Sequence, residues 1–140
     1  MKIKRFQGGF DNNFCYVLSC DETRTAAIID PSVEINPVIE YIDSNDLILD
    51  KILITHTHYD HIHYLDDFIN LYPLVKVYAS SNAKLSNSIN FHKLEHNDVI
   101  GLGKHLILSL STPGHYFDSV CYWIKSKDIV FTGDTMFVGR

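Results

Sequence analysis

Four side chains that can bind metal ions lie within a stretch of six residues: His56, His58, Asp60 and His61. Side chains two residues apart point the same way in an extended backbone, so the first three can converge. His61 would then come from the start of a helix. Imidazole suits zinc and iron, and carboxylate also suits harder cations, so the segment predicts two adjacent metals. A solvated polar loop is the alternative, but it explains poorly why the cluster directly follows the apolar residues 52–54.

Two further candidate ligands lie downstream, each directly after a glycine. His115 follows Thr-Pro-Gly at 112–114, where proline and glycine predict a tight turn that can aim one imidazole. Asp134 follows Gly133 at the end of an apolar run. Glycine would let the backbone pass close to a metal, and a carboxylate can bridge two cations with its two oxygens. Each residue alone would be an ordinary turn residue, but beside the first cluster both become candidate ligands.

The elements that must position these residues are strands interleaved with helices. Strands are predicted at residues 2–6, 15–19, 26–29, 52–54, 75–79, 106–110, 120–124 and 129–132. Asn36 and Pro37 predict an N-cap and the first position of a helix. Apolar residues at helical spacing predict a second helix from near His61 to before Pro73, while 82–90 is ambiguous, with one short helix as an option. The pattern predicts a mixed α/β domain in which two packed sheets are flanked by helices.

Composition limits the class of protein. The chain has 140 residues, 46% of them hydrophobic and 21% charged, which fits one folded domain over residues 1–140. The net charge of −5 argues against a nucleic-acid partner, and no segment approaches the length of a membrane span. An odd number of cysteines without a CxxC pair argues against a disulfide framework, and Cys15 and Cys121 lie in apolar strands as expected for buried thiols. We expect a cytoplasmic protein, and the oligomeric state stays open.

The three motifs resemble those of a known family. Residues 55–61 resemble the HxHxDH signature of the metallo-β-lactamase superfamily, and residues 112–115 and 132–135 resemble its two downstream ligand motifs. The residues Thr-Gly-Asp-Thr-Met-Phe at 132–137 resemble most closely the glyoxalase II branch, the hydroxyacylglutathione hydrolases. The resemblance runs from about Phe14 to the last residue and implies an α/β fold, the four-layer αββα sandwich.

The resemblance also implies a ligand set for two divalent metal ions, most often zinc, with iron or manganese as alternatives. His56, His58 and His115 would hold the first ion, Asp60 and His61 the second, and Asp134 would bridge the two. Asp30, directly before Pro31, matches a family aspartate close behind the ligands.

The sequence departs from the family pattern in three places. The family supplies a further histidine ligand well after the Gly-Asp motif, and the sequence ends at Arg140 without it, so we expect a domain that is incomplete on its C-terminal side. His63 stands where the family usually has a small residue, and it either points away from the site or adds a ligand. After His115 the family usually has Thr-x-Gly, whereas this chain has Tyr-Phe-Asp at 116–118, which can close the pocket differently. The remaining histidines are expected at the surface or in structural roles: His92, His96 and His105.

These features predict a metal-dependent hydrolase of a small thioester such as a hydroxyacylglutathione. A metal lowers the pKa of bound water to about 7, and the resulting metal-bound hydroxide would be oriented by Asp60 as the catalytic residue. A thiolate of pKa about 8.5 leaves easily, so the lack of an obvious acid near the motifs fits a thioester better than an amide. One alternative is a mononuclear iron enzyme acting on persulfides with oxygen, using His56, His115 and Asp134. The other is a non-catalytic fragment that binds a metal.

Overall fold

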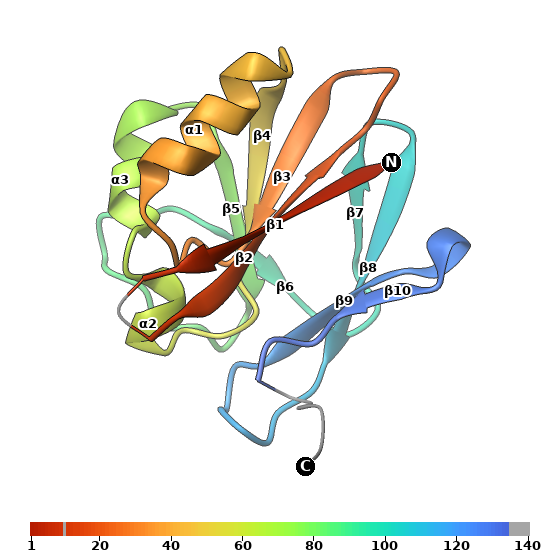
Figure 1. Ribbon diagram of the computed structural model, residues 1–140. Coiled ribbons are helices and arrows are strands. Elements are labelled where there is room, and N and C mark those ends of the chain that lie inside the picture. The colour runs from red at the N-terminus through yellow and green to blue at the C-terminus, as the bar shows by residue number, and fades with distance from the viewer. Residues whose placement is uncertain (10, 135–140) are drawn as a thin grey trace.

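The computed structural model describes residues 1–9 and 11–134 and contains two β-sheets packed face to face (Figure 1). Residues 135–137 of the third motif lie outside that range. The larger sheet has the strand order β1-β2-β3-β4-β5-β6, and the smaller has the order β10-β9-β8-β7. The strands of the larger sheet are β1 (Lys2–Gly8), β2 (Asn13–Ser19), β3 (Thr25–Ile29), β4 (Ile48–Leu53), β5 (Lys76–Ser80) and β6 (His92–Leu94). Those of the smaller sheet are β7 (Val99–Leu102), β8 (His105–Ser111), β9 (Val120–Ile124) and β10 (Ile129–Phe131).

The helices of the described residues cover one face of the larger sheet (Figure 1). They are α1 (Ile35–Ser44), α2 (Tyr59–Ile62) and α3 (Leu65–Leu71), and a short 3-10 turn, η1 (Lys125–Lys127), joins β9 to β10. From β3 to β6 the strands run parallel, whereas β1, β2 and β3 pair antiparallel. Three layers are therefore present, one of helices and two of sheet, and residues 1–9 and 11–134 place no α-helix outside the second sheet.

The strands β2, β3 and β4 of the larger sheet are buried on both faces over most of their length, which explains the continuous apolar runs in their sequence. Val17 and Ile52 belong to the core under the helices, while their neighbours Leu18 and Leu53 belong to the core between the two sheets. Successive side chains of a strand point to opposite faces, so each run supplies both cores. The burial predicted for residues 52–54 on two faces is confirmed.

The predicted second helix is broken into α2 and α3. The break falls at His63 and Tyr64, because the backbone N–H of Tyr64 donates to the carbonyl of Pro31 at 3.1 Å instead of continuing the helix. The helix does end before Pro73, as predicted. The first helix begins at Ile35 with Glu34 in the N-cap position, so the assignment of Asn36 as N-cap was wrong.

The structure also settles the open segment 82–90, adds two strands and shows the state of the cysteines. No helix forms in residues 82–90, which run as turns and irregular chain. Strands β6 and β7 were not predicted, because both are short, β6 begins with two polar residues, and Gly101 interrupts the apolar residues of β7. The cysteines are all buried and unpaired, as expected for Cys15 and Cys121, and burial raises the pKa of the Cys15 thiol. Among the described residues, no helix has the length and apolar character needed to cross a membrane.

Candidate metal centre

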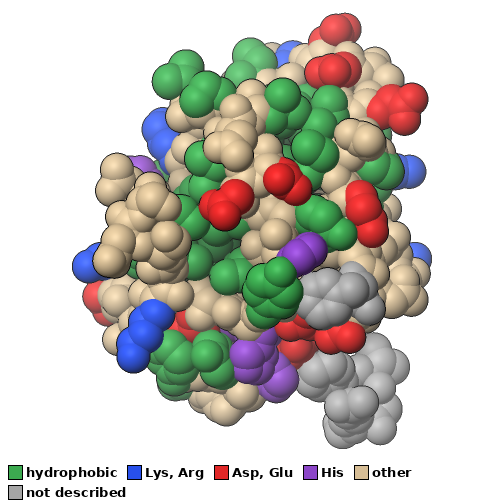
Figure 2. Space-filling model, turned by 90° about the vertical axis from the view of Figure 1, so that its left-hand side faces the viewer, with side chains coloured by type: hydrophobic (Ala, Val, Ile, Leu, Met, Phe, Trp, Pro, Cys, Tyr) green, Lys and Arg blue, Asp and Glu red, His purple; other side chains and the backbone are tan. Residues whose placement is uncertain are grey.

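The candidate ligands come from three chain segments that meet beside the carboxyl end of β4. His56 and His58 lie on the segment that leaves β4, and α2 follows at once with Asp60 and His61. His115 lies on the loop between β8 and β9, and Asp134 follows β10. Histidine and acidic side chains meet near the lower edge of the face seen in Figure 2. The packing of the two sheets therefore brings together residues that are far apart in sequence.

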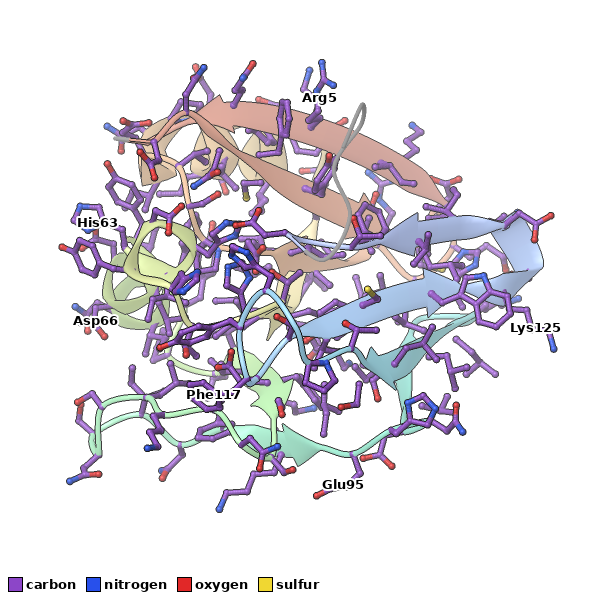
Figure 3. All side chains as sticks on the ribbon, turned by 90° about the horizontal axis from the view of Figure 1, so that it is seen from below. Arg5, His63, Asp66, Glu95, Phe117 and Lys125 are labelled. Atoms are coloured by element: carbon purple, nitrogen blue, oxygen red, sulfur yellow. The ribbon has the colours of Figure 1, made fainter. Side chains whose placement is uncertain are left out.

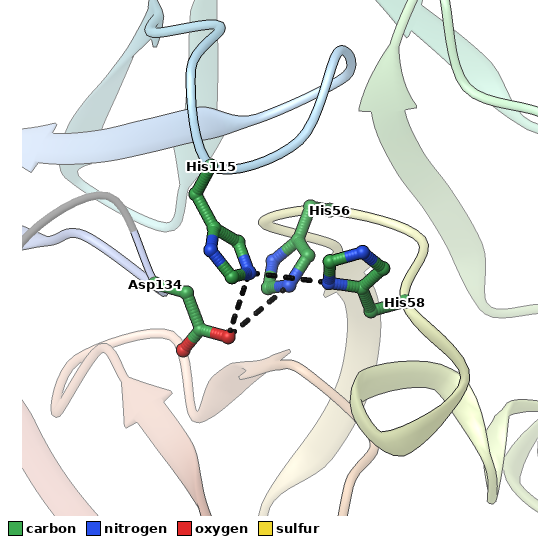
Figure 4. A group of neighbouring side chains, drawn as sticks. All are labelled: His56, His58, His115 and Asp134. Atoms are coloured by element: carbon green, nitrogen blue, oxygen red, sulfur yellow. Dashed lines mark hydrogen bonds and ion pairs between the residues drawn. The ribbon is translucent and has the colours of Figure 1, made fainter.

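Four of these residues form a compact group, drawn in Figure 4: His56, His58, His115 and Asp134. One potential ligand atom from each lies within 4.8 Å of all the others. Asp134 Oδ2 is 3.4 Å from His56 Nε2 and 3.1 Å from His115 Nε2. His115 Nε2 in turn lies 3.1 Å from His58 Nδ1. Three imidazoles and a carboxylate at this spacing match the tetrahedral donor set of a zinc ion.

The other two predicted residues, Asp60 and His61, lie next to this group. His61 Nε2 is 3.3 Å from Asp134 Oδ2 and 3.7 Å from Asp60 Oδ2. Asn13, at the start of β2, donates from Nδ2 to Asp60 Oδ2 at 2.7 Å and so fixes that carboxylate. All six predicted residues are therefore brought together, and Asp134 faces both groups.

A buried network behind the site fixes the two inner imidazoles. Asp30 is 3% exposed and accepts hydrogen bonds from the Thr55 backbone N–H at 2.8 Å, the Thr55 hydroxyl at 2.6 Å and His61 Nδ1 at 2.9 Å. Because the Thr55 hydroxyl donates to Asp30, its oxygen accepts from His56 Nδ1 at 3.0 Å. In the neutral form of each imidazole this network places the proton on Nδ1, and it turns Nε2 toward Asp134.

Burial and neighbouring charges move the pKa values of the two inner histidines in opposite directions. Burial, with the charge of His61, lowers the pKa of His56 to about 4. Burial also acts to lower the pKa of His61. The hydrogen bond and the charge of Asp30 outweigh burial, together with the charges of Asp134 and Asp60, and raise this pKa to about 9. Burial also works to raise the pKa of Asp60, and the Asn13 hydrogen bond and His61 outweigh it and lower the value.

The residues fit a metal on the evidence of two buried atoms. His56 Nε2 and His61 Nε2 are inaccessible to solvent and make no hydrogen bond. A buried polar atom without a partner is costly, and native proteins rarely keep one without a function. Both atoms face Asp134 across short distances. Two buried imidazole nitrogens beside one carboxylate oxygen are suited to cation binding, and a cation at His61 would replace the proton that its raised pKa keeps on the ring.

Gly133 lies where the chain passes Thr55. Its backbone is left-handed, with φ of +53°, and a Cβ added there would lie 2.5 Å from Thr55 Oγ1. Glycine thus lets the chain pass the hydroxyl that links His56 to Asp30.

The other histidines lie away from the site. His63 is exposed, its ring is 4.8 Å from that of Tyr59 and 4.5 Å from that of Tyr64, and Figure 3 places it at the periphery of the molecule. His92 begins β6 and is exposed, and the exposed His96 accepts the Ser111 backbone N–H at 3.0 Å. The partly buried His105 begins β8.

Sequence reasoning missed three residues that support the site: Asn13, Thr55 and Asp118. Thr55 precedes the first motif directly, so its position was the available signal. Asn13 and Asp118 become neighbours of the site only through the fold. Asp118 and the two aromatic residues before it form the loop that departs from the family pattern, and in it the Tyr116 ring packs 3.9 Å from the ring of His58.

A cavity of about 380 Å³ opens beside the inner residues. His61 and Asp134 lie at its polar end, and the apolar side chains of Phe14, Tyr16 and Phe131 line the remainder. Residues of β1, β2 and β3 line it on the side of the larger sheet, and residues of β10 line it on the side of the smaller one. It gives small molecules access to the side of the site that carries Asp134.

Comparison with known proteins identifies relatives for most of the chain. The chain is 37% identical over 134 residues to a probable hydroxyacylglutathione hydrolase of Schizosaccharomyces pombe, covering 92% of this chain and 51% of that protein. It is 33% identical to BaeB of Bacillus velezensis, a probable polyketide biosynthesis zinc-dependent hydrolase, covering 90% of this chain and 56% of that protein. The chain thus spans about half the length of these curated relatives.

Solved structures share the fold. ETHE1 of Myxococcus xanthus superposes with a TM-score of 0.86 and 29% identity, covering 99% of this chain and 59% of that one. The B3 metallo-beta-lactamase BLEG-1 superposes with a TM-score of 0.81 and 25% identity, covering 97% of this chain and 73% of that one. A protein-family model described as the metallo-beta-lactamase superfamily matches residues 8–140. The α/β fold expected from the motifs is confirmed, and the chain belongs to the metallo-beta-lactamase superfamily.

Proposed function

We propose that this chain carries the metal centre of a hydrolase that acts on a small thioester. The observation that carries the proposal is the pair of buried Nε2 atoms of His56 and His61, which make no hydrogen bond and lie 3.4 and 3.3 Å from Asp134 Oδ2. The family and the hydrolase names of the relatives support a metal-dependent hydrolase as the general class. The thioester is the finer part of the proposal.

The proposed ligand set follows the two groups of side chains. His56, His58 and His115 would hold one divalent ion, Asp60 and His61 would hold the other, and Asp134 would bridge them. When bound, two such ions polarise a substrate carbonyl and make a nucleophile available from water near neutral pH. Zinc fits the imidazole-rich first group best.

The protein's own residues hold this arrangement before any ion binds. Asp30 and Thr55 keep Nδ1 of both inner imidazoles occupied, so that Nε2 stays available. Asn13 holds Asp60 in front of His61, where its carboxylate can accept a proton from a water molecule. We assign Asp60 the catalytic role on this basis.

A thioester suits this site because its leaving group needs little help. A thiol has a pKa of about 8.5, so the thiolate departs without a strong acid, whereas an amine leaving group needs a proton. Relatives named as hydroxyacylglutathione hydrolases point to the same substrate class. We propose a hydroxyacylglutathione or similar small thioester as the substrate.

The test compares thioester hydrolysis by the intact protein with that by Asp60→Asn, with the metal content of both determined. Asn keeps the shape but loses the charge, so we expect kcat to fall about a thousandfold while the free energy of unfolding changes by less than about 1 kcal/mol. A matched amide should be a poor substrate. Near wild-type turnover by Asp60→Asn, or a single iron ion per active chain, would favour the mononuclear oxygen-using enzyme instead.

A further inference from the structure

Asp118 is a buried carboxylate that contacts the segment carrying two candidate ligands. It lies on the loop between β8 and β9 and is 2% exposed. Its Oδ1 accepts the backbone N–H of Thr57 at 3.3 Å, and its Oδ2 accepts the Thr57 hydroxyl at 2.6 Å. Thr57 stands between His56 and His58, so the carboxylate binds the residue that joins two imidazoles of the site.

Two other contacts join the same pair of segments. The Val120 backbone N–H donates to the Thr55 carbonyl at 2.7 Å, and the Tyr122 hydroxyl donates to the Ile54 carbonyl at 2.5 Å. Together with the bonds between Asp118 and Thr57 they form a row of contacts across the two sheets, which we call the cross-sheet clamp. Of the three contacts, the one made by Asp118 lies nearest to His58, because Thr57 directly precedes it while the other two contacts are to Ile54 and Thr55.

The clamp sets the distance between two imidazoles from different loops. His115 is three residues before Asp118, and His58 directly follows Thr57. Their ring nitrogens lie 3.1 Å apart, although His115 is on an exposed part of the loop. A carboxylate that accepts both a backbone N–H and a hydroxyl makes strong, directional bonds, and burial strengthens them further.

We propose that Asp118 is a positioning residue that holds the His56–His58 segment against the His115 loop and so raises the metal affinity of the group His56, His58, His115 and Asp134. The statement about metal rests on the proposed function, whereas the loop contact is a property of the metal-free protein. Groups that orient metal ligands without touching the metal typically contribute 10–100-fold in affinity. A purely structural role would lower the stability of the fold and leave the affinity of the folded protein unchanged.

The test uses four variants of the intact protein. Asp118→Asn keeps the shape but removes the charge and replaces one accepting oxygen by an Nδ2 donor, so the two hydrogen bonds that the carboxylate accepts cannot both be kept as they are. Thr57→Val removes the hydroxyl, and Thr57→Ser keeps both donors as the matched control. Ser109→Ala is a control for lost buried hydrogen bonds, because Ser109 Oγ donates to the carbonyls of Glu95 and Asp98 at 2.8 and 3.2 Å, both outside the clamp.

Two quantities are measured for each variant: zinc affinity by competition with a chelator, and hydrogen exchange of the Thr57 amide in metal-free protein. We expect Asp118→Asn to weaken zinc binding about 10- to 100-fold and to speed exchange of the Thr57 amide. Thr57→Val should weaken zinc binding by a smaller factor, since the backbone bond survives. Both controls should bind zinc within about twofold of wild type.

Unchanged zinc affinity and unchanged Thr57 exchange in Asp118→Asn would overturn the proposal, as would an equal loss of affinity in Ser109→Ala. If Asp118→Asn does not fold, Thr57→Val against Thr57→Ser decides the matter. Failure of wild-type protein to bind zinc would contradict the proposed function. The exchange of the Thr57 amide in the metal-free variants would then still decide whether Asp118 positions the segment.

Discussion

The site has two sides that are built differently. On the inner side, His56 and His61 are 1% and 4% exposed, and the network of Asp30 and Thr55 fixes both rings. On the outer side, His58 is partly buried and His115 is exposed, with one imidazole supplied by each of two loops. The inner rings are therefore held by the core of the protein, while the outer rings depend on contacts between loops.

This difference separates two demands on a metal site. The inner side keeps two buried nitrogens without hydrogen bonds, which lowers the stability of the metal-free protein but prepares the ligands. The outer side avoids that cost because its rings can meet water. Mutations on the inner side should therefore change stability, and those on the outer side should mainly change metal affinity.

The largest expected effect is on the inner side. In Asp30→Asn the backbone can keep its left-handed φ of +59°, because asparagine tolerates that conformation. The substitution removes the buried negative charge that accepts three hydrogen bonds. We expect metal-free protein to lose about 3 kcal/mol in the free energy of unfolding. His115→Ala on the outer side should cost about 0.5 kcal/mol or less. Chemical denaturation of both variants measures this, and equal losses would abolish the distinction between the two sides.

Zinc should stabilise the protein and act more strongly on the outer side. Zinc at about 100 times its Kd should add at most about 2.7 kcal/mol to the free energy of unfolding, and zinc bound by the unfolded chain reduces this gain. Hydrogen exchange should slow more in residues 112–117 than at Thr55 and His56, which are already fixed without metal.

Calorimetric titration should show two unequal steps, because the proposed first ion has four protein ligands and the second has three. Two equally tight steps would contradict the assignment of ligands.

A smaller effect is expected from the glycines that flank the two sides. Gly133→Ala places a methyl group 2.5 Å from Thr55 Oγ1 at a left-handed φ, and should cost about 2 kcal/mol in the free energy of unfolding. Gly114→Ala, on the outer loop, has no atom within 4 Å of the added methyl group and should cost about 0.5 kcal/mol or less. Thermal unfolding of the two variants provides the comparison, and a Gly133→Ala protein as stable as wild type would mean that Thr55 moves freely.

The smallest effect concerns the second ion. Asn13→Ala removes the hydrogen bond to Asp60 Oδ2 and should weaken the second zinc step about tenfold, with the first step unchanged. Gln7→Ala is the control on the same hairpin, because the Gln7 amide reaches only the Asn12 carbonyl at 3.4 Å among the hydrogen bonds described. Equal weakening of both steps would show that Asn13 supports the hairpin rather than Asp60.

The sequence predicted eight of the ten described strands and the four clustered residues from His56 to His61 well, because both depend on local pattern, whereas His115 and Asp134 gained weight only beside that cluster. Alternating burial in β2 and β4 and the close spacing of His56 to His61 can be deduced without knowing the fold. The break between α2 and α3 depends on a hydrogen bond from Tyr64 to Pro31, which local spacing does not contain. The supporting role of Asn13 is equally non-local, because it requires the first hairpin to lie over α2.

The origin of the ligands in the chain has a consequence for folding. His56, His58, Asp60 and His61 lie within six residues even in an unfolded chain, whereas His115 is 57 residues from the His58 ring that it meets. Closing so long a loop requires the second sheet to dock on the first, and we expect this to be a late step in folding. Metal supplied during folding therefore meets a local set of three histidines and an aspartate first. Metal that binds the unfolded chain stabilises the unfolded state as well as the folded one. The measured gain in the free energy of unfolding then reports only what the later ligands add.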